Sequence, residues 1–247
     1  MAQGSGLMAG KRGVIMGVAN NRSIAWGIAK ACHDQGAEIA FTWQGDALKK
    51  RVEPLAQELD AFLAGDCDVT NLDSIDAVFN NLEAKWGKID FVVHAIAFSD
   101  KDELTGRYIE TTRDNFAKTM DISVYSFTAV AARTEKIMND GGSLLTLTYY
   151  GAEKVMPHYN VMGVAKAALE ASVRYLAVDM GGRGIRVNAI APGYHKTSMT
   201  EDIWSVPELA GKIEHRTALK RWGSVDDLVG TCLFLASPAA LYVTGTT

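Results

Sequence analysis

The 247-residue sequence is poor in cysteine and proline, with three and five residues of these types. Cys32, Cys67 and Cys232 are widely spaced, which excludes a disulfide framework or a zinc site built on paired cysteines. No hydrophobic run reaches the ~18 residues that a membrane-spanning helix needs. We therefore expect a cytoplasmic protein with buried, reduced thiols, no bound metal and no membrane contact.

An excess of basic residues is also lacking, since 25 Lys and Arg stand against 29 Asp and Glu, a net charge of −4. Nucleic-acid-binding domains normally carry a basic surplus, so we expect no nucleic-acid partner. The hydrophobic content of 48% and charged content of 22% are those of an ordinary soluble domain and exclude a disordered or collagen-like chain. With no repeat or linker-like stretch, we expect a single domain over residues 1–247.

Short apolar runs alternate with segments of helical periodicity from about residue 13 to residue 190. Such alternation is typical of an α/β protein with a Rossmann-type, doubly wound parallel sheet and helices on both faces. We expect strands at 13–16, 38–43, 62–64, 91–95, 143–148 and 185–190. We expect helices at 23–35, 46–59, 72–85, 113–138 and 159–180.

The C-terminal part follows a different pattern. Residues 194–207 are irregular, and a further helix is expected at 225–236, capped by Ser224. A sheet of this kind takes one more strand after the last helix, where this sequence ends at Thr247.

The turn after the first strand suggests a dinucleotide site. Gly17 opens it, and Ser23 is placed to cap the following helix, whose N-terminus favours a phosphate. Gly17 and Gly27 are ten residues apart, so the usual Gly-x-Gly-x-x-Gly pattern is absent and an ordinary strand–helix loop stays open as an alternative. Gln44 ends the second strand where an acid usually binds the ribose. As a neutral amide it favours NADH over NADPH only weakly, since it neither repels nor attracts a 2′-phosphate.

Two further strand ends carry polar groups. Asp68 follows the third strand, where its carboxylate can accept a hydrogen bond from an adenine amine or cap the helix at 72–85. His94 ends the fourth strand, and we expect a structural histidine there. The small residues Ala95 and Ala97 after it leave space for a flat ligand near the backbone.

Tyr159 and Lys166 form the strongest constellation. Seven residues span 20° less than two helical turns, so the two side chains share a helix face. Gly163 lies between them and is expected to leave room for a ligand. We expect the ammonium to lower the pKa of the phenol, and Tyr149 to end the fifth strand at the same edge. The alternative is a core tyrosine with a surface lysine.

Taken together, these segments resemble the bacterial NADH-dependent enoyl-[acyl-carrier-protein] reductases, a divergent branch of the short-chain dehydrogenase/reductase superfamily. The likeness is continuous over about residues 7–190 and includes Phe-Thr-Trp-Gln, Leu-Thr-Leu-Thr-Tyr and Tyr-Asn-Val-Met-Gly-x-Ala-Lys. The seven-residue spacing from tyrosine to lysine is specific to this branch. The commoner branch has lysine four residues after the tyrosine, here Gly163, and serine thirteen residues before it, here Thr146.

The resemblance implies hydride transfer from NADH to a trans-2-enoyl thioester on acyl-carrier protein, the last step of the fatty-acid elongation cycle. It implies that Tyr159 stabilises the enolate oxygen, that Lys166 holds the nicotinamide ribose and that Tyr149 has a secondary catalytic role. The implied cofactor residues are Gly17, Ala19, Ser23, Ile24, Gln44, Asp68, Val69, Ala95, Ile96, Ala97, Lys166, His195 and Thr197. The implied substrate residues are Phe98, Leu104, Tyr149, Tyr159 and Met162. A homotetramer is also implied, with interfaces on the helices at 113–138 and 159–180. The region 194–223 is implied to cover the substrate.

The segment 191–247 departs from this pattern. It has Gly193-Tyr194-His195-Lys196-Thr197 where the reductases have Gly-Pro-Ile-(Lys/Arg)-Thr, and it resembles the commoner dehydrogenase branch. One hypothesis is therefore a reductase body joined to a dehydrogenase tail. Two alternative functions follow from it: an NAD(P)-dependent carbonyl or alcohol dehydrogenase, and a catalytically inactive dinucleotide-binding scaffold.

Overall fold

The centre of the protein is a six-stranded sheet, and the computed structural model describes residues 6–247 around it. The strand order is β3-β2-β1-β4-β5-β6, and every neighbouring pair is parallel. Because the winding direction reverses between β1 and β4, the expected Rossmann-type doubly wound sheet is confirmed. The strands are β1 (Arg12–Met16), β2 (Glu38–Trp43), β3 (Phe62–Asp66), β4 (Ile89–His94), β5 (Met138–Leu147) and β6 (Arg186–Ile190).

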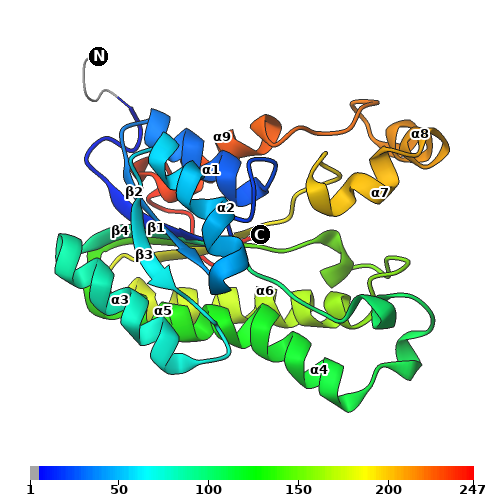
Figure 1. Ribbon diagram of the computed structural model, residues 1–247, viewed down its shortest axis with the longest axis horizontal. Helices are drawn as coiled ribbons and strands as arrows, with labels where there is room; N and C mark the ends of the chain where they lie inside the picture. The colour runs from blue at the N-terminus through cyan, green and yellow to red at the C-terminus, as the bar shows by residue number, and fades with distance from the viewer. Residues whose placement is uncertain (1–5) are drawn as a thin grey trace.

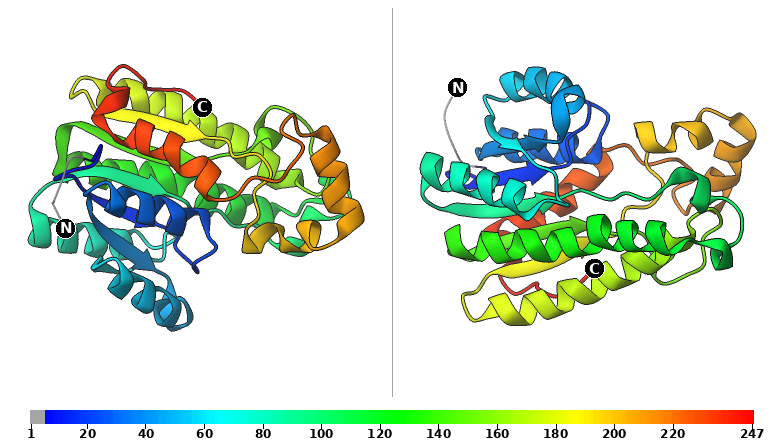
Figure 2. Two further views of the ribbon diagram at one scale, coloured as in Figure 1. Left: turned by 90° about the horizontal axis from the view of Figure 1, so that it is seen from above. Right: turned by 60° about the horizontal axis from the view of Figure 1, so that its bottom comes forward.

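Helices cover both faces of the sheet, as Figures 1 and 2 show. One layer consists of α1 (Ile24–Asp34), α2 (Gly45–Glu58) and α9 (Asp226–Ala236). The other consists of α3 (Leu72–Trp86), α5 (Ser126–Ile137) and α6 (Asn160–Gly181). Strand residues alternate between the two cores: Val14 and Met16 pack into one, and Ile15 packs into the other. This two-sided burial explains the continuous apolar runs of the strands.

The long helix expected at 113–138 is interrupted. It consists of α4 (Arg113–Met120), a π-helical turn η3 (Asp121–Tyr125) and α5, and β5 begins directly after α5. The wider turn brings Ser123 Oγ to 3.0 Å from both the amide nitrogen and the carbonyl oxygen of Phe98. The π-helical turn therefore fixes the chain just beyond the end of β4.

The region between β6 and α9 is more helical than the irregular segment expected at 194–207. It contains η5 (Ser198–Thr200), α7 (Glu201–Trp204) and α8 (Pro207–Arg216), which stand beyond one end of the sheet in Figure 1. We call residues 194–223 the lid. Arg22 holds it from the first loop through two hydrogen bonds to the Glu201 carboxylate, of 3.2 and 3.1 Å.

The last residues run beside β6. Gly245 N donates to Val187 O at 2.8 Å, and Thr246 O accepts from Ala189 N at 2.9 Å. The backbone thus pairs with β6 at the place where the further strand was expected. Within residues 6–247, no helix has both the length and the apolar character needed to cross a membrane.

Candidate active site

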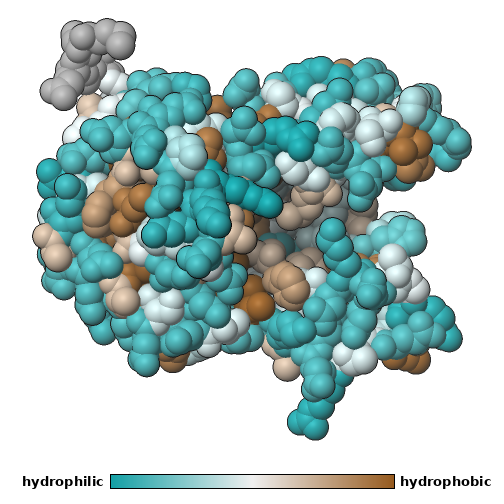
Figure 3. All heavy atoms as spheres, in the orientation of Figure 1, coloured by the Kyte–Doolittle hydropathy of each residue, from teal (hydrophilic) through white to brown (hydrophobic). Residues whose placement is uncertain are grey.

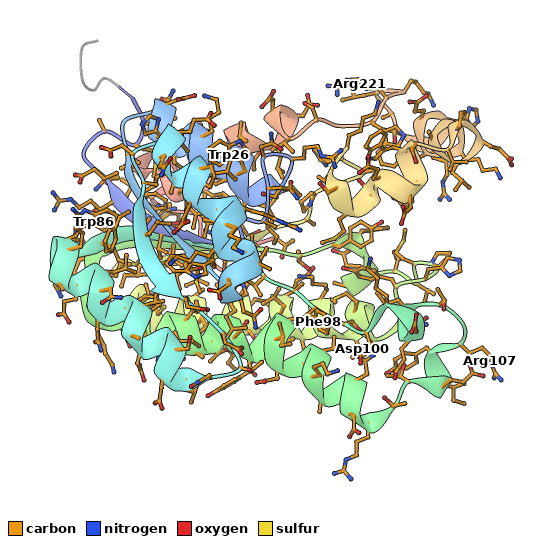
Figure 4. The ribbon with its side chains drawn as sticks, in the orientation of Figure 1. Trp26, Trp86, Phe98, Asp100, Arg107 and Arg221 are labelled. Atoms are coloured by element: carbon orange, nitrogen blue, oxygen red, sulfur yellow. The ribbon has the colours of Figure 1, made fainter. Side chains whose placement is uncertain are left out.

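The site lies where the carboxyl ends of the parallel strands meet, the usual ligand-binding edge of such sheets. Figure 3 shows a hollow between the lid and the segment around α4, lined partly by apolar atoms. In Figure 4, Phe98 lies on the α4 side of this hollow, with Arg107 farther out and Arg221 on the lid side. Phe98 is 46% exposed although it is a large aromatic side chain.

The first loop is shaped by Gly17 and Ser23. Gly17 has φ +98°, and a Cβ there would lie 2.1 Å from the carbonyl oxygen of Ala95. The ends of β1 and β4 therefore meet closely enough that only glycine fits. Ser23 caps α1 as expected, because its Oγ accepts from Trp26 N at 3.2 Å. Ala19 lies in the loop that leads to this cap, and Ile24 opens the helix.

The ends of β2 and β3 bring Gln44 and Asp68 close to each other. Hydrogen bonds from Thr70, and to a smaller extent from Gln44, lower the pKa of the Asp68 carboxyl. The capping alternative for Asp68 is wrong, since Asn71 caps α3 by accepting from Asp73 N at 3.0 Å. Asp68 therefore presents a carboxylate at this edge.

His94 is buried, and its ring contacts Ser126 Oγ at 2.9 Å and Thr146 Oγ1 at 3.4 Å. Burial, and to a smaller extent the nearby Lys166 ammonium, lower the pKa of His94 to about 3. A neutral, enclosed imidazole has a structural role, as expected. Thr146, at the position of the catalytic serine in the commoner branch, is buried and donates to the His94 carbonyl at 3.1 Å.

Four aromatic rings form a row along the site. The Tyr159 and Tyr149 ring centroids are 5.0 Å apart, those of Tyr149 and Tyr194 are 6.2 Å apart, and those of Tyr194 and Trp222 are 5.5 Å apart. Tyr159 directly precedes α6 instead of lying inside it. Its neighbour Asn160 has φ +36° and donates through Nδ2 to Glu103 O at 3.1 Å, which ties this end of α6 to the segment after β4.

Lys166 points inward from α6 and is only 6% exposed, so the surface-lysine alternative is wrong. Its ammonium donates to Leu147 O at 2.8 Å. Burial lowers the pKa of Lys166 to about 8, and the Glu170 carboxylate opposes that shift. The carbonyl takes one of the three ammonium donors, which suits a second role in holding hydroxyl groups.

Two expectations about this pair are wrong. The pKa of Tyr159 is raised instead of lowered, because burial penalises the phenolate while the Lys166 ammonium is directed to Leu147 O. Gly163 leaves no room for a ligand, because its space is taken by Gly151. A Cβ on Gly163 would lie 2.9 Å from Gly151 O.

Comparison with known proteins identifies the family. The family model described as Enoyl-(Acyl carrier protein) reductase matches residues 17–247. The chain is 73% identical over 245 residues to enoyl-[acyl-carrier-protein] reductase [NADH] 1 of Rhizobium meliloti (strain 1021), covering 99% of this chain and 90% of that protein. This chain belongs to the enoyl-(acyl carrier protein) reductase family.

Solved structures of such reductases have the same fold. The Anaplasma phagocytophilum reductase, crystallised in complex with NAD, is 51% identical with a TM-score of 0.91, covering 100% of this chain and 92% of that chain. The Bacillus cereus reductase, crystallised with NADP+ and indole naphthyridinone, is 45% identical with a TM-score of 0.93, covering 98% of this chain and 95% of that chain.

The sequence and family-model matches also run through residues 191–247, so the tail aligns with the reductases despite its dehydrogenase-like residues. The joined-tail hypothesis stays a prediction.

The other residues implied by the reductase resemblance fall into two groups. Leu104 and Met162 pack together with Tyr159 in a small apolar cluster, whereas Phe98 stands outside it at the hollow. His195 and Thr197 lie at the base of the lid, where His195 pairs with Gly223 and Thr197 Oγ1 is 3.2 Å from Thr200 Oγ1. Within residues 6–247, no three His, Cys, Asp or Glu side chains converge in a metal-binding arrangement.

Sequence reasoning missed Glu170 and Tyr194. Glu170 is four residues after Lys166, a spacing that places both side chains on one face of a helix. In the structure the two do not bond to each other, and each is hydrogen-bonded to the end of β5 or the residue after it. Tyr194 carries no such local signal, because its contact with Tyr149 depends on the pairing of β5 with β6, whose ends at Leu147 and Ile190 lie side by side.

Proposed function

We propose that this chain uses NADH to reduce trans-2-enoyl thioesters of acyl-carrier protein to acyl thioesters, the last step of fatty-acid elongation. The observation that carries the proposal is Tyr159 beside Tyr149, with a buried lysine seven residues later, at the carboxyl edge of this sheet. The family membership supports it, since the Rhizobium meliloti relative is named as an NADH-dependent reductase.

The residues present fit a dinucleotide. The close approach of Gly17 to β4 and the capped N-terminus of α1 suit a pyrophosphate, together with Ala19, Ser23 and Ile24. When bound, the dinucleotide supplies the hydride. We assign the remaining contacts by position in the fold. On the adenosine side, Gln44 contacts the ribose, and Asp68 and Val69 contact the adenine. On the nicotinamide side, the ribose lies against Lys166 and residues 95–97 (Ala95, Ile96 and Ala97), and the carboxamide is bound by His195 and Thr197.

Tyr159 acts on the thioester oxygen in this proposal. Because burial raises its pKa, the phenol keeps its proton at neutral pH and donates a hydrogen bond where negative charge develops. Tyr149 limits the position of the thioester beside it, and Leu104, Met162 and Phe98 offer apolar surface to the acyl chain. Lys166 holds the cofactor ribose through its remaining donors.

The carbonyl or alcohol dehydrogenase is the weaker candidate for this site. Its serine position is occupied by Thr146, which is buried against His94, and its lysine position by Gly163, which is packed against Gly151. NADH is favoured over NADPH because Gln44 brings no positive charge. Lys49, the nearest cation in sequence, is engaged with Glu53 at 3.6 Å and lies over the Trp43 ring.

Tyr159→Phe is expected to lower kcat for enoyl reduction by about 100-fold or more, since it removes one donor to a developing oxyanion. The measurement is NADH oxidation at 340 nm with crotonyl- or dodecenoyl-thioester. Tyr150→Phe is the matched control, because Tyr150 is adjacent to Tyr149 and 50% exposed, and it should leave kcat unchanged. Turnover of 3-ketoacyl or sugar substrates in place of enoyl thioesters would show that the protein is a carbonyl or alcohol dehydrogenase. NADH binding without any turnover would show that it is an inactive dinucleotide-binding scaffold.

We propose that the protein is a cytoplasmic homotetramer. Tyr175 and Val178 on α6 are 77% and 80% exposed, an unusual amount of apolar surface for one helix of a monomer. Light scattering is expected to give a mass about four times that of the chain, and Tyr175→Glu to lower it by placing a charge in a buried contact. A wild-type monomer at micromolar concentration would contradict the tetramer.

The three cysteines are buried and unpaired, which agrees with a reducing compartment.

A further inference from the structure

The end of β5 is attached to α6 at two successive residues. Lys166 Nζ donates to Leu147 O at 2.8 Å, and Thr148 Oγ1 donates to Glu170 Oε1 at 2.8 Å. Lys166 and Glu170 are one helical turn apart on α6. The Lys166 ammonium and the Glu170 carboxylate are therefore bound to two successive residues at the strand end that leads into Tyr149.

Different structural elements bring different groups toward the Lys166 ammonium. β5 contributes the Leu147 carbonyl, and β4 contributes His94, which is neutral. The residue before α6 is Tyr159, whose phenol keeps its proton because of burial. The negative charge that acts on Lys166 is that of Glu170.

We propose that Glu170 is a positioning residue for Lys166: anchored by Thr148, its carboxylate lies at the strand end to which the ammonium is bound and keeps Lys166 directed along β5, where it presents its donors to the cofactor ribose. The inference rests on the proposed function only in taking Lys166 as the ribose contact. Thr148 in turn positions Glu170, because its hydroxyl hydrogen bond keeps the carboxylate from turning toward solvent.

The expected pH dependence follows from the sign of each effect. Burial favours the neutral amine and brings the pKa of Lys166 to about 8, whereas Glu170 raises it. The ammonium is present below this pKa and is lost as the pH rises through it. Neutralising Glu170 therefore moves the loss of the ammonium to lower pH.

The test is NADH affinity of the apo-protein between pH 6 and pH 9.5, followed by NADH fluorescence. In Glu170→Gln the alkaline midpoint of binding should fall by about one pH unit, the usual size for one nearby charge. Affinity at pH 8.5 should then fall about tenfold, while affinity at pH 6 stays within about twofold of wild type. Asp179→Asn is the matched control, because Asp179 is an exposed acid on the same helix, and it should not move the midpoint.

Thr148→Val provides a second variant that keeps both charges. It should shift the midpoint in the same direction by a smaller amount, because the carboxylate loses its anchor. An equal loss of affinity at every pH in Glu170→Gln, or an unchanged midpoint in both variants, would overturn the inference and leave Glu170 a packing residue. Enoyl-thioester turnover is measured separately, so NADH binding with the expected shift but no turnover would support the inference while refuting the proposed reductase.

Discussion

Gly17→Ala is expected to abolish measurable NADH binding and to lower the free energy of unfolding by about 3 kcal/mol or more. A methyl group would lie 2.1 Å from the Ala95 carbonyl oxygen and 2.7 Å from its carbon, and both are backbone atoms. The clash is relieved only if the ends of β1 and β4 separate. The loop that we propose to bind the pyrophosphate begins at this point, so its displacement should remove the geometry that a dinucleotide requires.

The control must separate the effect of the steric clash from the strain of a positive φ. Gly87, at the end of α3, has φ +73° but no atom within 4 Å of the position of a Cβ. Gly87→Ala should therefore cost only about 1–3 kcal/mol, the strain of a sparsely populated backbone conformation, and should leave NADH affinity unchanged. Thermal unfolding and NADH fluorescence on both variants measure the two effects. Wild-type affinity in Gly17→Ala would show that the strand ends are more adaptable than the structure indicates.

The sheet could be predicted from sequence because its strands, apart from the edge strand β3 and the start of β5, are largely buried on both faces. Val14, Ile15 and Met16 point alternately into two cores, so this part of the strand is a continuous apolar run, bounded by Gly13 and Gly17. The interruption at 121–125 could not be predicted, because a single π-helical turn adds one residue inside an otherwise continuous helical segment and has no residue signal of its own, such as Pro or Gly. The helices of the lid were also missed, since α7 and α8 are short and none of their residues is buried in a core.

At the site, residue identity was easier to predict than charge behaviour. The seven-residue spacing from Tyr159 to Lys166 is a local property of the sequence, and it indicated a common function although Tyr159 lies just before α6. The pKa of a group depends on burial and on partners from other elements. Leu147 O, which receives the Lys166 ammonium, and Gly151, which fills the space beside Gly163, both come from the end of β5 and the turn after it. Their positions follow from the packing of β5 on α6.

Lys166→Met is expected to lower NADH affinity and kcat/KM for enoyl reduction by about 100-fold, the loss of charge-assisted hydrogen bonds to the ribose. Its Tm should be equal to that of wild type or higher, because methionine has a similar length and no buried charge to desolvate. Lys30→Met is the control, since Lys30 forms an exposed pair with Asp34 at 3.1 Å, and both activity and Tm should stay unchanged. An NADH affinity within threefold of wild type in Lys166→Met would show that Lys166 does not bind the cofactor.

Adding Gly163→Lys to Lys166→Met is expected not to restore activity, although it recreates the four-residue spacing of the commoner branch. A Cβ at 163 would lie 2.9 Å from Gly151 O, so any side chain there must push the turn after β5 away from α6. Gly151 itself packs against the Tyr159 ring, and a Cβ on it would lie 2.5 Å from Tyr159 Cδ1. The turn, the tyrosine and the glycine are therefore packed as one unit, and a lysine at 163 would displace the tyrosine that it is meant to assist. Recovery of enoyl reduction in the double variant would show instead that a four-residue spacing can function on this backbone.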